Sequence, residues 1–330
     1  MSGFIRFTKG DLPATPSLGR CDAHEHLALG GPFIAQEHPE LDLSDSDATV
    51  RELANFVQAG GGWVVDAMPT CCSRRPRELA DLSRRSGVPI VMSTGRHLEQ
   101  YYPAGDTHVT LDRDALRDLM IREIEQGVDG CRCGLIKVAG GAGRLSDLER
   151  DAFIAAAQAQ QATGCPIMTH TEADPQGVWD QVHTLIDHGA DPSKVVLSHL
   201  DKNTDVAFHH DVLQAGVRLE YDQHFRRLQR GDAREPDPFD LITQSVEAFA
   251  DSILLGMDLA RRSYWSERGG SPGLTWLLKD LPAGLVQSGL RTQQIDRLMI
   301  NNAIAAFSFM LHATVQQSPT MNPGISEITP

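Results

Sequence analysis

The 330-residue sequence lacks the features that mark several classes of protein. Its first residues contain no long apolar stretch, and no run of about 18 apolar residues occurs anywhere, so we expect neither a signal peptide nor a membrane span. It has no long run of basic residues and a formal net charge of −14, which argues against a nucleic-acid partner because phosphate binding requires Lys and Arg. We therefore expect a cytoplasmic protein that acts on a small molecule.

The cysteines also lack the spacing of a known metal or disulfide motif. An adjacent pair and a C-x-C are present, but neither supplies the paired C-x-x-C of a zinc ribbon. In a chain of this length and compartment we expect reduced, buried thiols. The six cysteines are Cys21, Cys71, Cys72, Cys131, Cys133 and Cys165.

Short runs rich in valine and isoleucine alternate with segments of helical spacing, and glycine closes several of these segments, as helix C-termini prefer. Eight such strands predict a single-domain α/β protein over 1–330, folded as a (β/α)₈ TIM barrel. A doubly wound sheet would alternate in the same way, but no G-x-G-x-x-G motif follows the first strand. The expected strands are 20–26, 63–67, 89–93, 134–138, 166–169, 195–198, 217–221 and 253–256.

The two ends of the chain lie outside this alternation. Residues 1–18 are expected to lead into the barrel, and the last helix is expected at about 292–311, where apolar residues recur with helical spacing. The polar, proline-bearing segment 313–330 is expected to form a tail.

Six polar side chains occur at the C-terminal ends of the expected strands, where barrel enzymes place their catalytic groups. His24 and His26 are two residues apart in one strand, so they should share a face, whereas Glu25 should point away and act as a structural acid. Four histidines and an aspartate are ligands suited to zinc or a similar divalent ion. The six residues are His24, His26, Lys137, His170, His199 and Asp258.

Each of these residues alone has an ordinary explanation. A histidine at a strand end is usually a satisfied polar group, a lysine there reaches solvent, and an aspartate caps the next helix. Their equivalent positions in one barrel favour a shared site. The surrounding segments resemble the phosphotriesterase-like branch of the amidohydrolase superfamily, over about 19–309. The matching motifs are DAHEHL, GLIKVAGG, PIMTHTEA, VVLSHLDKN, ILLGMDLARRSYW and NNAIAAF.

The resemblance implies a hydrolase with two divalent ions per chain, zinc by default, with manganese, iron or cobalt as alternatives. Lys137 would be N6-carboxylated by CO₂ and would bridge both ions. A hydroxide shared by the ions would attack the substrate, and Asp258 would relay a proton to the leaving group. The resemblance assigns His24, His26 and Asp258 to the more buried ion and His170 and His199 to the more exposed one.

Arginine and aromatic residues follow the third, seventh and eighth expected strands. Arg261 lies three residues after Asp258 and three before Tyr264, so a helix there would place all three on one face. Any single arginine could belong to a solvated surface, but arginine also grips phosphate or carboxylate with two hydrogen bonds. The substrate-binding candidates are Arg261, Tyr264, Arg226, His97 and Tyr101.

The RRSYW segment resembles the lactonase-type relatives in this family. The first choice of function is therefore a lactonase or carboxyl-ester hydrolase that opens a small anionic lactone, either phosphorylated or carboxylated. Three alternatives stay open: phosphotriesterase (aryldialkylphosphatase) activity, including as a side reaction, amidase activity on a small N-acyl compound, and a non-catalytic metal-binding barrel. A homodimer is also left open.

Overall fold

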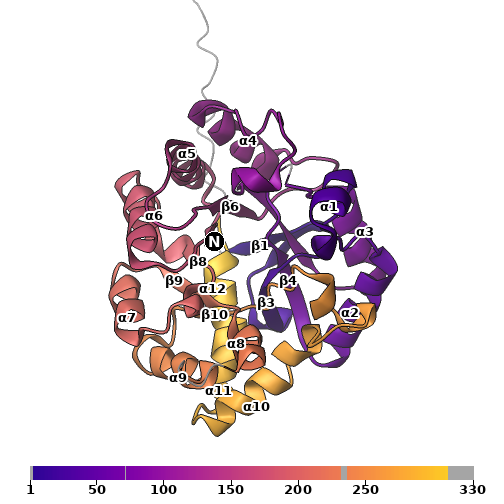
Figure 1. The fold of residues 1–330 in the computed structure, drawn as a ribbon, viewed down its shortest axis with the longest axis vertical. Coiled ribbons are helices and arrows are strands. Elements are labelled where there is room, and N and C mark those ends of the chain that lie inside the picture. The colour runs from indigo at the N-terminus through magenta and orange to yellow at the C-terminus, as the bar shows by residue number, and fades with distance from the viewer. Residues whose placement is uncertain (1–2, 71, 232–235, 311–330) are drawn as a thin grey trace, which may run out of the picture.

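A computed structural model describes residues 3–70, 72–231 and 236–310 of the protein. Eight parallel strands form one sheet in the order of the chain, and helices surround them (Figure 1). All eight expected strands are present, with ends that differ from the expected ones by no more than three residues. They are β3 (Arg20–Glu25), β4 (Gly61–Asp66), β5 (Ile90–Arg96), β6 (Leu135–Ala139), β7 (Ile167–His170), β8 (Val195–Leu197), β9 (Arg218–Tyr221) and β10 (Ile253–Leu255).

The sheet closes on itself to form the predicted barrel. Each strand from β3 to β9 pairs in parallel with the next one in the chain. The last and first strands meet where the backbone N–H of Asp258 donates to the carbonyl oxygen of His24 at 2.8 Å. The prediction of a single (β/α)₈ barrel is therefore confirmed.

The helices begin and end at residues that local chemistry favours. Helix α5 starts with a capping box between Ser146 and Glu149 and stops at Gly164, which has a φ of 72° that glycine adopts without strain. The helices up to the eighth strand are α1 (Pro32–Glu37), α2 (Ser46–Gln58), α3 (Pro76–Ser86), α4 (Arg113–Glu125), α5 (Asp147–Thr163), α6 (Pro175–Asp187), α7 (Val206–Gln214), α8 (His224–Arg230) and α9 (Pro238–Phe249).

The N-terminal end of the barrel is closed by an N-terminal hairpin and by the last described helix. Within 1–18, strands β1 (Phe4–Phe7) and β2 (Gly10–Pro13) form an antiparallel hairpin. Phe7 of this hairpin packs in one apolar cluster with Phe307 and with inward-facing residues of the strands. The barrel is therefore filled and sealed at this end.

The C-terminal helical segment follows α10 (Asp280–Gln287) and runs from Thr292 to Phe307 as α11, a π-helical turn and α12. It ends earlier than expected, because Phe309 pairs with Phe4 through two backbone hydrogen bonds of 3.0 and 3.1 Å. Asn302 anchors it by donating to carbonyl oxygens at the base of β10. The expected tail, 313–330, lies outside the described residues. The three pieces are α11 (Thr292–Asp296), the π-helix (Arg297–Asn302) and α12 (Ala303–Phe307).

Two expectations drawn from what the sequence lacks can be compared with the structure. Within the described residues, no helix combines the length and the apolar character that a membrane span requires. The five described cysteines are all free and buried, as expected, while Cys71 lies outside the described residues.

Candidate active site

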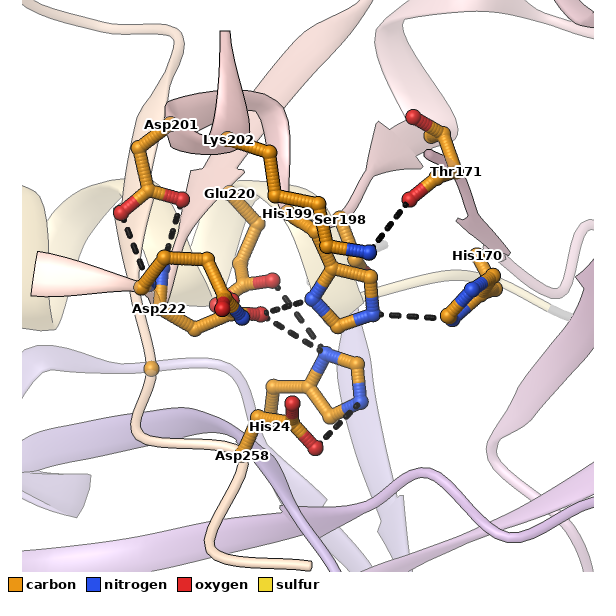
Figure 2. A network of polar contacts seen from close by, with 12 residues as sticks. His24, His170, Thr171, Ser198, His199, Asp201, Lys202, Glu220, Asp222 and Asp258 are labelled. Atoms are coloured by element: carbon orange, nitrogen blue, oxygen red, sulfur yellow. Dashed lines mark hydrogen bonds and ion pairs between the residues drawn. The ribbon is translucent and has the colours of Figure 1, made fainter. Parts of the chain in front are cut away.

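The structure gathers five of the six predicted residues at the C-terminal mouth of the barrel, and Figure 2 shows four of these, His24, His170, His199 and Asp258. A cavity of about 350 Å³ opens there. Five of the six line it: His24, His26, His170, His199 and Asp258. The expected strand-end position of Lys137 is wrong, because Lys137 is buried in the middle of β6 and does not line the cavity.

The backbone bends sharply at two of these residues. His199 and Asp258 have φ angles of 64° and 47°, in the left-handed region that non-glycine residues rarely adopt. Such strain is typical of functional sites, where the surrounding structure enforces it. Gly256 permits the close approach of β10 to β3, because a Cβ there would lie 2.9 Å from the backbone nitrogen of His24.

His24, His26 and Asp258 converge on one point. Oδ1 of Asp258 lies 3.0 Å from Nε2 of His26 and 4.0 Å from Nε2 of His24. Its Oδ2 accepts from Arg226 at 3.1 Å. Burial alone would raise the pKa of Asp258, but Arg226 and the histidines hold it well below its usual range. The carboxylate is therefore ionised, as a ligand or a proton acceptor must be.

His170 and His199 form a second convergent pair. Nε2 of His199 lies 3.0 Å from Nδ1 of His170. Burial lowers the pKa of His170 to about 3 and that of His24 well below its usual value. These rings are therefore neutral at physiological pH, which is the protonation state that binds a metal ion.

Lys137 is a buried amine that loses its proton more readily than an exposed lysine. Its Nζ lies 3.4 Å from Oγ of Ser198 and 3.5 Å from the carbonyl oxygen of Thr169. Burial lowers the pKa of Lys137 to about 8. A larger fraction of neutral amine is therefore present than in an exposed lysine, and the neutral amine is the form that reacts with CO₂.

This donor set fits a divalent metal ion. The ligand atoms of His24, His26 and Asp258 all lie within 4.8 Å of one another. The 3.0 Å contacts are close to the separation of two ligands on one ion, since Zn–N bonds are roughly 2.0–2.1 Å. Nδ1 of His26 is buried without a hydrogen-bond partner among the described residues. Neutral imidazole and carboxylate together suit zinc or a related ion.

Buried acids beneath these histidines were missed by the sequence reasoning. Glu220 and Asp222, on and just after β9, are buried and approach Nδ1 of His24 at 3.2 and 3.4 Å. Asp222 also lies 2.6 Å from Nδ1 of His199. Burial and the charge of Asp222 raise the pKa of Glu220 well above its usual value. The i, i+2 spacing in LEYD would have indicated that both acids face the barrel interior.

Glu25 is a structural acid, as its position predicted. Its carboxylate accepts the backbone N–H of His26 at 3.1 Å and that of Leu259 at 3.2 Å. These bonds tie the end of β3 to the segment that follows β10. Glu25 therefore supports the backbone of two site residues and does not line the cavity.

All five candidate substrate residues line the same cavity. The ring of His97 lies 5.2 Å from that of His170 and 4.9 Å from that of Tyr101. The guanidinium of Arg226 stacks over the ring of Tyr264, 4.9 Å from its centre. The last candidate, Arg261, lies on the exposed side of the mouth.

The expected helical face that joins Asp258, Arg261 and Tyr264 is wrong. The chain from 256 to 261 has no helix, and a short 3₁₀ turn begins only at Arg262. The left-handed turn at Asp258 breaks the regular path, and buried Trp265 holds the segment by donating from Nε1 to the carbonyl oxygen of Leu259. The side chains reach one cavity through a loop.

Lys202 and Glu172 are further cavity residues that the sequence reasoning did not identify. Nζ of Lys202 lies 2.9 Å from Oε2 of Glu172, whose other oxygen lies 3.0 Å from Nε2 of His170. Lys202 follows His199 by three residues in the SHLDKN motif, so its position after a barrel strand was the available signal. The mouth thus holds three cationic side chains, from Lys202, Arg226 and Arg261.

The fold and this mouth are those of a (β/α)₈ barrel enzyme, and comparison with known proteins shows that it is a hydrolase and which family it belongs to. The family model described as "Phosphotriesterase family" matches residues 6–307, so the chain belongs to that family. It is 29% identical to a phospho-furanose lactonase of Mycoplasmopsis agalactiae, over 93% of this chain and 92% of that one.

Two other similar proteins are a relative with a different named activity and a lactonase of known structure. An N-acetyltaurine hydrolase of Rattus norvegicus is 28% identical, over 92% of this chain and 97% of that one. The crystal structure of a lactonase from Listeria monocytogenes superposes with a TM-score of 0.84 and 25% identity, covering 93% of this chain and 99% of that one. Because these relatives act on different bonds, they support a hydrolase but do not define the substrate.

Proposed function

We propose that the protein is a metal-dependent lactonase that opens a small anionic lactone, such as a phosphorylated sugar lactone. The observation that carries this proposal is the mouth itself, where three cationic side chains and the convergent histidines line one cavity of about 350 Å³. Glu172 and Asp258 pair with Lys202 and Arg226, so Arg261 at the exposed side of the mouth supplies most of the charge that favours an anionic substrate.

The site would hold two divalent ions, zinc by default. When bound, the ions would polarise the scissile carbonyl and lower the pKa of water, so that hydroxide is available at neutral pH. Lys137 would be carboxylated and shared by both ions. Its burial and lowered pKa support this assignment. The remaining ligands would be His24, His26 and Asp258 for one ion and His170 and His199 for the other.

Asp258 would take the proton released during attack and pass it to the leaving oxygen. Its carboxylate is held by Arg226 on one oxygen and faces His26 with the other, so its direction is fixed before substrate arrives. Its depressed pKa favours the ionised form that accepts a proton. Transfer to an alkoxide is favourable, because the alkoxide is far more basic than the carboxylate.

Lys202, Arg261 and Tyr264 would bind the anionic group of the substrate. Lys202 and Arg261 supply charge, and Tyr264 supplies a hydroxyl on the same cavity wall. Arg226 forms an ion pair with Asp258, so its main contribution would be to the electrostatic potential and the shape of the cavity. His97 and Tyr101 pack against each other beside His170 and would contact the ring of the lactone.

Amide hydrolysis is the second candidate. A relative named N-acetyltaurine hydrolase matches most of the chain, and the taurine part of its named substrate carries a sulfonate, which is also an anion. The cationic mouth would accept such a group. Phosphotriesterase activity is a third candidate because of the family, but a neutral triester has no anionic group for Arg261 at the exposed side of the mouth to bind.

The decisive experiment is turnover of a matched panel by protein loaded with zinc or manganese. The panel contains a phosphorylated γ-lactone, the same lactone without phosphate, an N-acyl aminosulfonate and a neutral phosphotriester. We expect the highest kcat/KM on the phosphorylated lactone. Faster hydrolysis of the N-acyl compound would replace the lactonase proposal with the amidase, and a preference for the neutral lactone would contradict the anionic substrate.

We also propose a cytoplasmic location with neither a nucleic-acid nor a membrane partner. Five free, buried cysteines among the described residues and the net charge of −14 support it. Fractionation of the native cells, followed by immunodetection, tests the location. Detection mainly in a membrane or secreted fraction would contradict it.

A further inference from the structure

The carboxylate of Asp222 contacts one histidine from each proposed ion site (Figure 2). Its Oδ2 lies 2.6 Å from Nδ1 of His199 and 3.4 Å from Nδ1 of His24. Its Oδ1 accepts from Nε2 of Gln223 at 2.5 Å. Asp222 is completely buried and does not line the cavity. It therefore acts on the two rings and not on substrate.

A carboxylate at this position decides which nitrogen of each ring carries hydrogen. A neutral imidazole has one N–H, and an ionised carboxylate can only accept a hydrogen bond. Nδ1 of His199 must therefore donate to Asp222, and Nδ1 of His24 must donate to Glu220 at 3.2 Å, with Asp222 as its second carboxylate neighbour at 3.4 Å. Both Nε2 lone pairs are then free. Nε2 of His199 faces His170 at 3.0 Å, and Nε2 of His24 faces Asp258 at 4.0 Å. Each ring presents its free lone pair to the mouth.

We propose that Asp222 is a positioning residue that fixes the tautomer and orientation of His24 and His199 together and so couples the binding of the two ions. The proposal rests on the two-ion site of the proposed function and adds the residue that links its halves. A ring held in the correct tautomer needs no rearrangement when an ion binds. Because Asp222 contacts both rings, although Glu220 also holds His24, a change in the position of its carboxylate on binding one ion alters the ring that binds the other.

Glu220 provides a matched control within the same strand. It is as buried as Asp222 and approaches Nδ1 of His24 at 3.2 Å, but lies beyond ion-pairing distance of His199. His24 therefore has two carboxylate neighbours, whereas Asp222 is the carboxylate neighbour of Nδ1 in His199. Asp222→Asn should disturb both ion sites, and Glu220→Gln should disturb only the one that contains His24.

The first measurement is ion affinity, which needs no substrate. Chelator-stripped wild type, Asp222→Asn and Glu220→Gln are titrated with Zn²⁺ in competition with a chromophoric chelator, after circular dichroism confirms folding. We expect two ions in wild type, about 10–100-fold weaker binding of both in Asp222→Asn, and weakening of one in Glu220→Gln. Two ions bound by Asp222→Asn with wild-type affinity would overturn the proposal. Three ions in wild type would also overturn it, because the acids would then be ligands themselves.

The second measurement uses metal-free protein and therefore separates this proposal from the proposed function. Nitrogen-15 spectra of histidine-labelled wild type should show His24 and His199 as Nδ1–H tautomers, and Asp222→Asn should remove that preference at His199. An Nε2–H tautomer at either ring in wild type would overturn the proposal, even if the variant fails to fold. Wild type that shows these tautomers but binds no ion would contradict the two-ion site while leaving the tautomer role of Asp222 intact.

Discussion

The two ends of the barrel are built from the same eight strands but differ in chemistry. At the N-terminal end, strand side chains such as Trp63 and Leu254 pack with Phe7 of the hairpin and Phe307 of the last helix in one apolar cluster. At the C-terminal end, histidines and acids at or just after the strand ends line an open cavity, and a lysine is buried within β6.

The backbone differs between the ends in the same way. Among the described residues, five non-glycine residues have positive φ, and four of them lie in loops that follow the C-terminal end of a strand. These four are Ser73, Ala173, His199 and Asp258. Strain and buried charge both destabilise a fold, so the apolar end must supply the stability that the mouth lacks. The comparison predicts that substitutions at the mouth reduce function, and substitutions at the sealed end reduce stability.

The largest effect is expected from Lys137→Ala. The change removes the group proposed to join both ions, so kcat/KM for the phosphorylated lactone should fall by more than about 10⁴-fold and bound metal should be lost. Addition of a small carboxylic acid should restore part of both, because its two oxygens can occupy the vacated space. Elemental analysis and turnover measure the result. An unassisted variant with wild-type activity would show that Lys137 only fills the barrel.

Asp258→Asn should lower kcat by roughly 10²–10⁴-fold, the range for a lost general acid–base group. The amide keeps the shape of the side chain but cannot take up the proton. Steady-state kinetics with the phosphorylated lactone separates kcat from KM. A raised KM with unchanged kcat would mean that Asp258 helps to bind substrate and does not relay a proton.

At the sealed end, Phe7→Ala should reduce the free energy of unfolding by about 3–5 kcal/mol, the usual cost of deleting a buried aromatic ring. The ring of Phe7 meets that of Trp63 edge to face, with centres 5.7 Å apart. Denaturant-induced unfolding measures the loss of stability. The kcat measured at denaturant concentrations below the unfolding transition should be unchanged. Leu12→Ala, in the same hairpin but exposed, is the control and should change little. A large fall in kcat for Phe7→Ala would contradict the view that the sealed end provides stability and the mouth provides function.

The smallest effect is expected at the rim of the mouth. Arg261→Met and Tyr264→Phe should each lower kcat/KM for an anionic lactone by about 10–150-fold, which corresponds to a charged hydrogen bond of roughly 1.5–3 kcal/mol. A neutral lactone of the same ring size should be nearly unaffected. Equal losses on the two substrates would assign these residues to the support of the rim and remove the argument for an anionic substrate.

The sequence was sufficient for the barrel and for the convergence of five of the six predicted residues. Apolar strand runs are local patterns, and parallel strands place their C-terminal ends together whatever the loops do. The predicted helical turn from Asp258 to Tyr264 is absent. A left-handed residue at Asp258 and the tertiary packing of Trp265 determine the path of this segment, and neither can be read from local sequence spacing.

The buried acids were hidden for a different reason. Glu220 and Asp222 occupy the inward positions of a strand, a pattern that the sequence displays, but a carboxylate at such a position is normally excluded by its desolvation cost. Only the three-dimensional proximity of His24 and His199 accounts for their burial. Lys202 was missed because its contacts with the carbonyl oxygen of Thr171 and with Glu172 join segments about 30 residues apart in the sequence.

The central claim is that the mouth works through two ions held by these side chains. Chelator-stripped protein titrated with Zn²⁺ while turnover of the phosphorylated lactone is recorded tests it most directly. The account predicts no turnover without metal and a rise that reaches its plateau at two equivalents per chain. A plateau at one equivalent, or full turnover in the stripped protein, would contradict it.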